Sequence, residues 1–487
     1  MINLNEKFTT FILSALKILL GILMVVSLIT VIGKLIGINL SIIPVIIIYG
    51  LNILGGYFII KSKLSSKKKI FIILLQAFII RVLWIINVNS QPGSDFNTMY
   101  QAALQLINGD NSMFTGTAYL GRFPHLTGMV LYMALMRSIF PVSSILAMKI
   151  VNLFLGVSVV YLLYLTVNEL FENINYSLYA ALGATLLPSL VSYTTVLCSE
   201  NIAMPFYIFS VYLFIKFIKG NRKIYLLLFS SILLAVGNFF RTVATVVLIA
   251  YILYSIVYYK GMLKNKINMI VALIIPYIMF MIIVSTTLQT MDITEYPLWR
   301  GSEPSITNVL KGTNILSGGR WNSEDASLPE ECNFDYNLIE ERSKEIIIER
   351  LTGTSPIILL IFYITKFSLQ WNEGDFAGVF WAQYNLEDSD IIIDFSKGGT
   401  GIMQVFYTAI LILIFLGLFN KNKIKENQAI NLIYIILCGY GLAYLITESQ
   451  GRYSYICSWI FVILAVVGLD FIKSRMAERR YKTHEEK

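Results

Sequence analysis

The sequence predicts an all-α polytopic membrane protein with about 12 transmembrane helices, interfacial helices on the outer face and an acidic outer loop. Of its 487 residues, 56% are hydrophobic and only 14% are charged, a composition that excludes an ordinary soluble domain. Apolar runs of roughly 17 to 25 residues, long enough to cross a hydrocarbon core of about 30 Å, recur along the chain. Basic clusters separate these runs, so the charge pattern also predicts an orientation.

The first apolar run is too long for the core of a signal peptide and has no small-residue cleavage site behind it, so we expect a membrane span there. The later runs are separated by short polar connections, apart from two long ones that we assign to the outer side. The predicted spans are 11–32, 42–60, 69–88, 145–166, 176–197, 202–218, 224–240, 242–259, 267–287, 402–418, 429–446 and 453–469.

Charge decides which connections lie inside. By the positive-inside rule, the basic clusters belong in the cytoplasm. In contrast, the connection 288–354 holds twelve acids and six bases, a net charge of −6, and is expected outside. Both termini are then cytoplasmic. The basic clusters are 61–69, 216–223, 260–266, 421–425 and 473–482.

Two further apolar runs, 124–140 and 355–370, would break the alternation of sides if they crossed the membrane. We therefore expect both to be interfacial helices on the outer side. The predicted organisation is two extra N-terminal spans in 1–60, a core in 61–287 with a first outer loop at 89–144, an outer region in 288–401, and three C-terminal spans with a basic cytoplasmic tail in 402–487.

Metal and disulfide chemistry are not indicated by the sequence. The four cysteines lie far apart without a CxxC pair, and the only histidines are His125 and His484. We expect no cofactor and no metal ligands, although a divalent cation is not excluded by the composition. The net charge of +8 resides in the clusters between apolar runs, so it reports orientation and does not indicate a nucleic-acid partner.

Several polar residues fall on the predicted outer face. Asp95 follows the third span and heads an amphipathic segment that should lie flat on the outer leaflet. Glu200 precedes the sixth span, Arg241 lies in the hairpin after the seventh, and Arg452 follows Glu448 in the last outer turn.

Each of these residues also has a plainer interpretation. Asp95 alone suits a helix cap, and Glu200 alone suits a solvated loop acid. Arg241 could be an interfacial residue that extends its charge into water, and Arg452 could form a structural ion pair with Glu448. What favours a functional site is that two carboxylates and at least two arginines reach one face from distant segments.

This set of groups suits the transfer of a sugar from a lipid phosphate to a hydroxyl. Such a transfer needs a base for the acceptor proton and cations for the departing phosphate. A guanidinium matches a phosphate with two parallel hydrogen bonds. Because nucleotide sugars are cytoplasmic, a site on the outer face would use a polyprenyl-phosphate sugar that has already crossed the membrane.

The ordered motifs resemble those of the GT-C glycosyltransferases, in the branch with protein O-mannosyltransferases and the lipid A aminoarabinose transferase. The oligosaccharyltransferase catalytic subunit is a more distant relative of that branch. The resemblance implies that Asp95 is the catalytic carboxylate, that Glu200 is a second carboxylate, and that Arg241 and Arg452 bind the donor phosphate. The motifs are "RVLWIINVNSQPGSDFNTMYQAALQLINGD", "RFPHLTGMVLYMALMRSIFP", "LPSLVSYTTVLCSENIAMPF" and "ESQGRYSY".

The sequence departs from the family pattern at several points. The usual acidic pair is Asp95 followed by Phe96, so binding of a metal by two carboxylates is not expected in this loop. Pro124 stands alone where the family has paired prolines, and residues 1–60 precede the family core. Further candidates for substrate contacts are Arg122, His125, Glu373, Asp375 and Glu448, with Trp299, Trp321, Trp371 and Trp381 for sugar stacking or membrane anchoring.

We therefore predict an inverting membrane glycosyltransferase that uses a polyprenyl-phosphate sugar, with Asp95 as general base. The acceptor would be a glycan, protein or lipid hydroxyl outside a bacterial plasma membrane. One alternative is a multi-span transporter or lipid flippase, which predicts charges at the bilayer midplane, where Arg81 is the main exception to an apolar pattern. Another is an outer-face polysaccharide polymerase or ligase.

Overall fold

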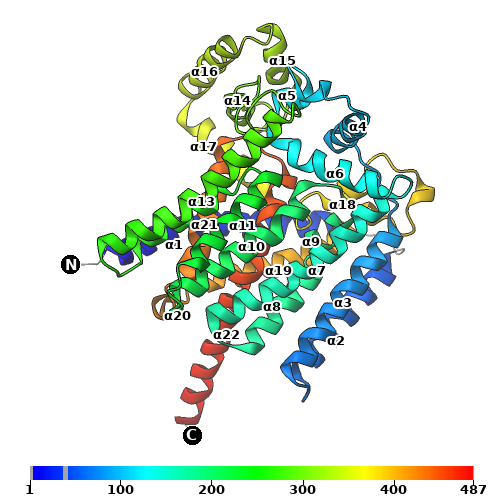
Figure 1. The fold of residues 1–487 in the computed structure, drawn as a ribbon. Helices are drawn as coiled ribbons and strands as arrows, with labels where there is room; N and C mark the ends of the chain where they lie inside the picture. Colours follow the sequence, from blue (N-terminus) through cyan, green and yellow to red (C-terminus); the bar gives the residue numbers. More distant parts are fainter. Residues whose placement is uncertain (1–3, 37–41, 486–487) are drawn as a thin grey trace.

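The computed structural model describes residues 4–36 and 42–485, with side chains up to residue 479. Within these ranges the chain is helical, and its sole extended pairing is an isolated antiparallel bridge between Val88 and Ile391. Figure 1 shows a bundle of long helices with a small group of helices beyond one end. The predicted all-α architecture is confirmed.

Eight described helical segments are long and apolar enough to cross a membrane, and each coincides with a predicted span. The last of them begins as a 3-10 segment, Gly451–Cys457, and continues as an α-helix. The eight are α1 (Leu4–Ile36), α2 (Ile43–Lys61), α3 (Ser66–Asn87), α7 (Ser144–Phe171), α10 (Ser199–Ile218), α13 (Leu263–Thr290), α19 (Gly399–Gly417) and α22 (Ser458–Glu485).

The other four predicted spans are helical but short or bent. Three are single short helices, α11 (Tyr225–Phe240), α12 (Thr245–Val257) and α21 (Ile430–Ile446). The predicted span 176–197 is not straight, because α8 (Ile174–Leu186) and α9 (Pro188–Ser192) are broken by a bend of 58° at Leu187. Proline removes a backbone donor and keeps the preceding residue extended, which accounts for the break. Length and composition thus support 8 to 10 spans, and the count of twelve stays a prediction.

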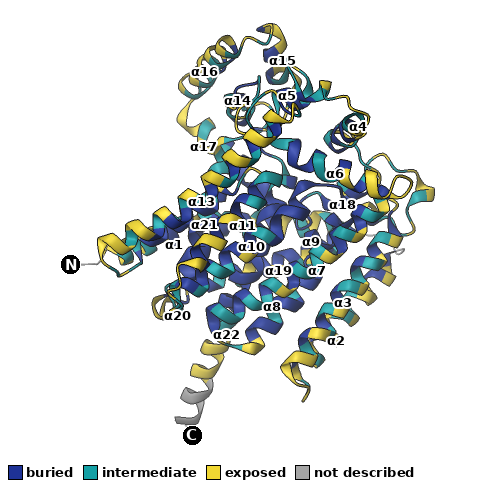
Figure 2. Ribbon diagram, in the orientation of Figure 1, coloured by how far each residue is buried: buried dark blue, intermediate teal, exposed yellow. Residues whose placement is uncertain are grey.

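The helices of the bundle differ sharply in burial. In the most apolar window of α10, 67% of the residues are buried, whereas the corresponding value for α2 is 17%. Figure 2 shows the buried residues concentrated in the middle of the bundle, with exposed residues along α1 to α3 and α13. Apolar side chains exposed along α1 and α2 fit helices that face lipid, so the two N-terminal helices form the periphery of the bundle.

The predicted first outer loop forms a layer over one end of the bundle. It contains α4 (Asp95–Ile107), α5 (Tyr119–Arg122) and α6 (Thr127–Ile139), and α4 packs against α6. Phe96, Met99 and Ala103 are buried on one side of α4, as the amphipathic pattern predicts. This layer brings Asp95, the first residue of α4, next to Arg452 in the segment that precedes α22.

The predicted acidic loop is folded into helices. α14 (Ile306–Gly312), α15 (Ser323–Glu331) and α16 (Tyr336–Gly353) enclose a small core of Leu310, Leu328, Cys332 and Ile339. We call this unit the outer domain. It leads into α17 (Pro356–Trp371), which covers the predicted interfacial run and meets α16 at a bend of 114°. The short helices α18 (Gly378–Ala382) and α20 (Lys421–Glu426) complete the chain.

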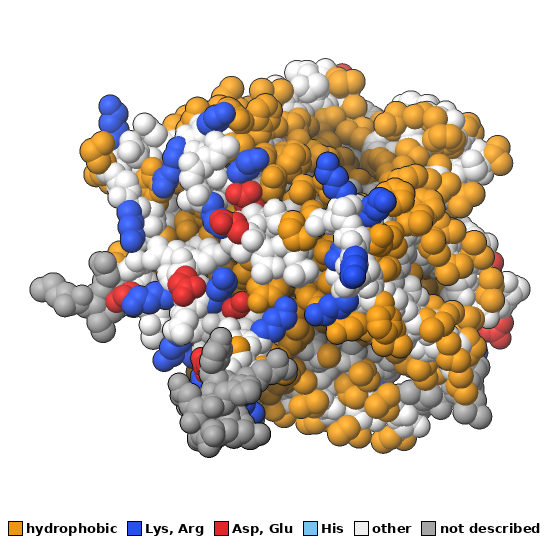
Figure 3. All heavy atoms as spheres, turned by 90° about the horizontal axis from the view of Figure 1, so that it is seen from below, with side chains coloured by type: hydrophobic (Ala, Val, Ile, Leu, Met, Phe, Trp, Pro, Cys, Tyr) orange, Lys and Arg blue, Asp and Glu red, His pale blue; other side chains and the backbone are white. Residues whose placement is uncertain are grey.

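The predicted cytoplasmic clusters meet at the opposite end of the bundle. Lys219 forms an ion pair with Glu172, while Lys423 lies over the ring of Phe171 and Lys473 over that of Tyr176. Figure 3, seen from below, shows lysine and arginine side chains spread over this face. Basic residues from distant segments therefore share one end, which is the arrangement that the positive-inside rule requires.

Candidate functional site

Four predicted site residues converge near the outer domain. Asp95 is the first residue of α4, and Glu200 lies in the first turn of α10. Arg241 directly follows α11, and Arg452 belongs to the 3-10 segment that precedes α22. We call these four residues the polar centre.

Asp95 faces Arg452. Arg452 Nη2 lies 3.9 Å from Asp95 Oδ2, and the arginine side chain is buried while 48% of the aspartate side chain is exposed. The N-cap of α4 is Ser94, which has a φ of +51°, so Asp95 is not the helix cap that its position suggested. Its carboxylate is thus accessible on one side and close to a buried cation on the other.

Glu200 faces Arg241. The distance from Arg241 Nε to Glu200 Oε1 is 3.4 Å, without the geometry of a hydrogen bond. Glu200 is buried at the N-terminus of α10, where the helix dipole favours a negative charge, so it is not a solvated loop acid. Burial disfavours the charged form of Arg241, but Glu200 together with neighbouring tyrosines outweighs this effect and raises the pKa of the guanidinium above its usual value.

Tyr453 joins the two pairs. The centre of its ring lies 5.0 Å from Arg241 Cζ and 5.5 Å from Arg452 Cζ. Its hydroxyl donates a hydrogen bond of 3.3 Å to Glu448 Oε1, which also accepts one from Gln450. Glu448 therefore reaches the polar centre through Tyr453, and no ion pair links Glu448 to Arg452 among the described residues.

Aromatic rings hold the Arg452 side chain. Besides Tyr453, the rings of Phe96 and Trp381 lie 4.8 Å and 5.0 Å from its Cζ atom. These contacts stabilise the cation but use none of its N–H groups. Arg452 Nε and Nη1 are buried without a hydrogen-bond partner in the part of the chain that the structure describes. Since buried polar groups are normally paired, these donors indicate a site for an anionic ligand.

Two cavities flank the polar centre. The first, which we call the Arg452 cavity, has a volume of about 400 Å³. Its walls include Arg452, Arg320, Glu373, Trp321 and Trp381. Burial raises the pKa of Glu373 above its usual value, so this acid resists ionisation.

The second, which we call the Arg122 cavity, has a volume of about 390 Å³. Arg122 is already paired, because it donates hydrogen bonds from Nε and Nη2 to Glu303 Oε2 at 2.8 Å and 2.6 Å. Burial lowers the pKa of His125 to about 4, which leaves the imidazole neutral near pH 7. Trp299 and Arg300 lie at the exposed side of this cavity.

Two of the predicted contact residues do not reach the polar centre. Asp375 is buried, and its Oδ2 accepts a hydrogen bond of 2.8 Å from the backbone of Val379 in α18. Trp371 is buried among aromatic rings that include Phe376 and Tyr444, so it is not available to stack on a sugar. Both residues belong to the packed structure that supports the site.

Sequence reasoning missed Tyr119, Tyr453 and the aromatic contacts of Arg452. Burial and the neighbouring Asp95 carboxylate raise the pKa of Tyr119, so its hydroxyl stays protonated beside that acid. Adjacency in the sequence could have indicated two of the aromatic contacts, since Tyr453 follows Arg452 and Phe96 follows Asp95. Nothing in the sequence pointed to Tyr119.

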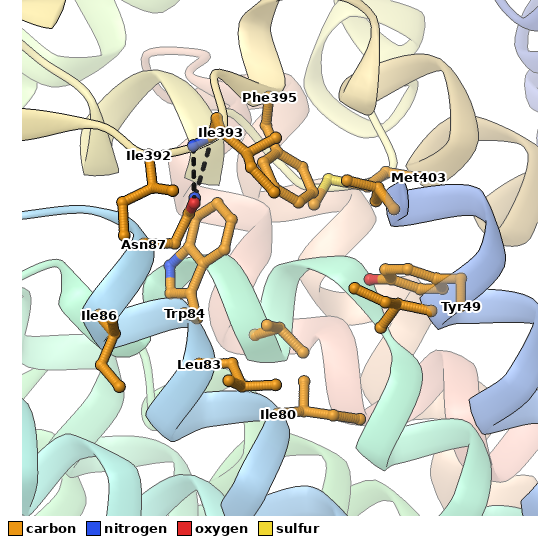
Figure 4. Close-up of a pocket in the computed structure, with 13 residues that line it drawn as sticks. Tyr49, Ile80, Leu83, Trp84, Ile86, Asn87, Ile392, Ile393, Phe395 and Met403 are labelled. Atoms are coloured by element: carbon orange, nitrogen blue, oxygen red, sulfur yellow. Dashed lines mark hydrogen bonds between the residues drawn. The ribbon is translucent and has the colours of Figure 1, made fainter. Parts of the chain in front are cut away.

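An apolar cavity of about 250 Å³ lies apart from this site, between α2, α3 and the segment that precedes α19. Figure 4 shows Tyr49, Ile80, Trp84 and Met403 around it, and Asn87 exchanging two hydrogen bonds with the backbone of Ile393. No charged side chain lines this cavity. It can accommodate an apolar chain but offers no groups for a transfer reaction.

No group of three or more metal-binding side chains is found among the described residues. Asp95 is followed in the sequence by Phe96 and not by a second acid, and its ion-pair partner is Arg452. The polar centre therefore suits the binding of a phosphate by arginines, and not through a metal ion held by a cluster of carboxylates.

Comparison with known proteins finds a family model that matches part of the chain. Residues 128–288, about a third of the chain, match the family model described as dolichyl-phosphate-mannose-protein mannosyltransferase. The match includes Glu200 and Arg241 but neither Asp95 nor Arg452. No curated protein sequence matches the chain.

Among solved structures, the fold is similar to the apo form of the oligosaccharyltransferase of Archaeoglobus fulgidus, with a TM-score of 0.50 and 11% identity. This likeness covers 85% of the present chain and 52% of the archaeal one. A second structure, the same organism's AglB with an inhibitory peptide and a dolichol-phosphate, has a TM-score of 0.47, 12% identity and coverages of 86% and 52%. The chain spans about half the length of these proteins, and at such identities the likeness concerns the fold alone.

Proposed function

We propose that this chain, a membrane glycosyltransferase of the GT-C superfamily by its family match and fold, moves a sugar from a polyprenyl-phosphate donor to a hydroxyl acceptor. The observation that carries the proposal is the pairing of a half-exposed carboxylate with a buried arginine that has unused N–H groups. Asp95 and Arg452 are 3.9 Å apart, and Arg452 Nε and Nη1 have no partner within the described chain.

The arginines bind the donor phosphate. Two N–H groups of Arg452 are buried away from water without a partner in the described chain, and a bound anion would offset the cost of this desolvation. Arg241 adds a second cation over the Tyr453 ring, and Glu200 holds Arg241 in position. The description of the matched family, which names dolichyl-phosphate mannose, supports a donor of this class.

Asp95 acts as the general base. The acceptor oxygen attacks C1 of the sugar, and its proton passes to the Asp95 carboxylate. The bond between C1 and the phosphate oxygen breaks, and its electron pair leaves with the lipid phosphate, whose charge the arginines stabilise. A single displacement of this kind inverts the configuration at C1. The exposed side of Asp95 gives an acceptor access to the base.

We place the reaction on the outer face of the plasma membrane. The basic clusters gather at one end of the bundle (Figure 3), and α4, which begins at Asp95, lies at the other (Figure 1). The orientation is testable in a cysteine-free background with a maleimide that cannot cross membranes. We expect the maleimide to label Leu316→Cys in intact cells, since Leu316 is 98% exposed. We expect no labelling of Met262→Cys, because Met262, which is 72% exposed, lies at the basic end of the bundle. The reverse pattern would put the site in the cytoplasm.

The test of function uses the full chain in proteoliposomes with polyprenyl-phosphate mannose and a cell-envelope extract as acceptor source. Asp95→Asn keeps the size of the side chain and removes the base, so we expect transfer to fall by roughly 10² to 10⁴-fold with donor binding retained. Asp110→Asn, at an exposed acid of the same outer loop, is the matched control and should stay at wild-type activity. Full activity of Asp95→Asn would refute the assignment.

A transporter would instead rely on polar groups inside the bundle. Arg81 of α3 is fully buried, but its Nη1 donates to the backbone of Ala77 in the same helix, and its guanidinium packs closely against Gly156. Arg81 Nε and Nη2 have no hydrogen-bond partner in the described chain, as is also true of Nε and Nη1 of Arg452, so Arg81 is the residue on which a transport function would rest. A sugar-flux assay with the same proteoliposomes separates the two functions, since a transporter would move substrate without forming a glycosidic bond.

A further inference from the structure

The polar centre lies close to both cavities, although its residues line only the first. Arg452 lines the first cavity, and its partner Asp95 lies beside Tyr119, whose ring packs at 5.4 Å against that of Phe123 in the wall of the second. Arg241 is followed directly by Thr242, which also lines the second cavity. A donor and an acceptor could therefore occupy separate cavities and meet at Asp95.

The two cavities differ in charge. The Arg452 cavity holds a cation with unused donors and a second arginine, Arg320, for which no ion pair is found within the described residues. In the Arg122 cavity, Arg122 is neutralised by Glu303, which also accepts a hydrogen bond of 2.6 Å from Thr307. A second arginine of this cavity, Arg300, is exposed and lies over the ring of Tyr336, so of the two cavities only the Arg452 cavity holds a buried guanidinium with donors unused in the described chain. The first cavity thus suits a phosphate and the second a neutral ligand.

The walls of the Arg122 cavity are rich in neutral hydrogen-bonding groups. Asn238, Thr242 and Thr245 line it from the bundle, and Ser305 and Asn308 from the outer domain side. Trp299, with 60% of its surface exposed, adds a flat apolar ring at the edge. Hydroxyl and amide groups around an aromatic ring match the alternating polar edges and apolar faces of a sugar.

We infer that the Arg122 cavity is the acceptor site and that it takes a saccharide, whose hydroxyl attacks the donor sugar held at the Arg452 cavity. This inference rests on the proposed function and names the acceptor class for the same reaction. The atoms balance as in that reaction: the saccharide oxygen forms the new bond to C1, its proton goes to Asp95, and the lipid phosphate leaves with the electron pair.

The wall of this cavity is held in place before any ligand binds. Ser302 donates from its backbone to Gly121 O at 3.0 Å and from its hydroxyl to Gly116 O at 2.8 Å. A Cβ at Gly301 would lie 2.1 Å from Arg122 O, so only glycine permits this close approach. A preformed wall lowers the entropic cost of binding a saccharide. Because the outer domain contributes to the wall, the acceptor enters from the aqueous side.

Two tryptophans provide a matched pair of variants. Trp299 lies at the Arg122 cavity and Trp321 at the Arg452 cavity, with exposed fractions of 60% and 58%, so replacement of either should leave the fold intact. With polyprenyl-phosphate mannose and a titrated envelope extract, Trp299→Ala should raise half-saturation for the extract at least 10-fold and leave the donor KM unchanged. Trp321→Ala should raise the donor KM instead. The opposite assignment, or equal effects of both variants on both substrates, would overturn the inference.

Failure of the inference can be told apart from failure of the proposed function. Without extract, the wild-type protein should release polyprenyl phosphate slowly as water replaces the acceptor. If the wild-type protein consumes no donor with or without extract, the proposed function fails. If it consumes donor but Trp299→Ala transfers normally to the extract, only the acceptor site is refuted.

The acceptor class is tested on the labelled product. Radiolabelled mannose should be recovered on material that resists exhaustive protease digestion and is cleaved to short labelled saccharides by mild acid. Recovery of the label on protease-released peptides would show a protein acceptor, and recovery in the organic phase on a lipid without a glycan would show a lipid acceptor. Either result would overturn the saccharide assignment.

Discussion

Two arginine–aspartate pairs of this molecule differ in how completely their polar atoms are hydrogen-bonded. In the outer domain, Arg350 donates to both oxygens of Asp325 at 2.7 Å and 3.2 Å, and Asn314 and Asn322 donate to the same carboxylate. In the polar centre, Arg452 lies 3.9 Å from Asp95 and keeps two buried N–H groups without partners in the described chain. The first pair is complete by itself, and the second is complete only with a ligand.

This difference separates a structural ion pair from a functional one. A buried pair stabilises a fold when the remaining lone pairs and protons are hydrogen-bonded, as they are around Asp325. An unsatisfied buried cation costs stability, and a protein retains it where binding recovers the cost. Stability and activity should therefore respond in opposite ways when the two pairs are disrupted.

The largest expected effect comes from truncating the two arginines. Arg452→Ala should lower kcat/KM by about 10² to 10³-fold, because it removes a donor that faces the departing phosphate. Its Tm should fall much less than that of Arg350→Ala, since the Asp95 carboxylate that it leaves behind is half exposed and two buried N–H groups without partners are removed. Arg350→Ala should destabilise the outer domain by about 3 to 5 kcal/mol, because it leaves Asp325 buried without its cation.

Thermal unfolding followed by intrinsic fluorescence, together with transfer rates per folded molecule, checks both variants. The fraction of Arg350→Ala that remains folded should transfer the sugar at the wild-type rate. A loss of Tm in Arg452→Ala as large as that in Arg350→Ala would mean that both pairs are structural, and the comparison would fail.

A smaller effect is expected from two buried glutamates that hold arginines. Glu200→Gln removes the carboxylate that faces Arg241, and Glu303→Gln removes the one that binds Arg122. Loss of a charged partner costs about 1 to 3 kcal/mol, or roughly 5 to 150-fold in an equilibrium constant. For Glu200→Gln the loss should appear as weaker binding of the donor, and for Glu303→Gln as a higher half-saturation for the acceptor. Substrate titrations that gave the same pattern for both variants would contradict two separate sites.

The comparison can also be sharpened by pH, because His125 lies in the cavity that we assign to a neutral ligand. Its pKa is about 4 in the folded protein against 6.5 in a model peptide, so the folded state favours the neutral imidazole. The corresponding stability is fully present above pH 6.5 and is lost as the pH falls through 4. At pH 5 the loss amounts to at most about 2 kcal/mol.

His125→Gln removes this titration. Between pH 7.5 and 5, the Tm of the variant should therefore fall less than that of the wild-type protein. Arg137→Gln, at the far end of the helix that follows His125, provides a control without a group that titrates in this range. Equal Tm profiles for His125→Gln and the wild-type protein would show that folding does not lower the pKa of His125.

How much of this molecule the sequence could predict depends on whether a feature is local or formed by packing. The apolar runs predicted a helix at each of the twelve positions, because span length and hydropathy are local properties. The mixed charges of residues 288–354 hid the three helices of the outer domain, whose small core includes Leu310 and Ile339. Their apolar positions are few and widely spaced, so no strong periodic pattern is visible.

The candidate site divides in the same way. Counting charged connections predicted that Asp95, Glu200, Arg241 and Arg452 would share one face. The partners could not be predicted, because α4, α10, α11 and the segment before α22 determine them by how they pack. Sequence proximity suggested that Glu448 pairs with Arg452, whereas the structure pairs Asp95 with Arg452 and links Glu448 to Tyr453.

The smallest expected effect concerns Tyr453, which lies between the two arginines. Its ring contacts both guanidinium groups, but its hydroxyl makes only a long hydrogen bond of 3.3 Å to Glu448. Tyr453→Phe keeps the ring, so donor binding should weaken by about 1 kcal/mol at most, roughly fivefold. Tyr453→Leu removes the aromatic face from both cations and should weaken donor binding more than Tyr453→Phe does. If titrations with polyprenyl-phosphate mannose gave the reverse order, the hydroxyl and not the ring would be the group that positions the arginines for the phosphate.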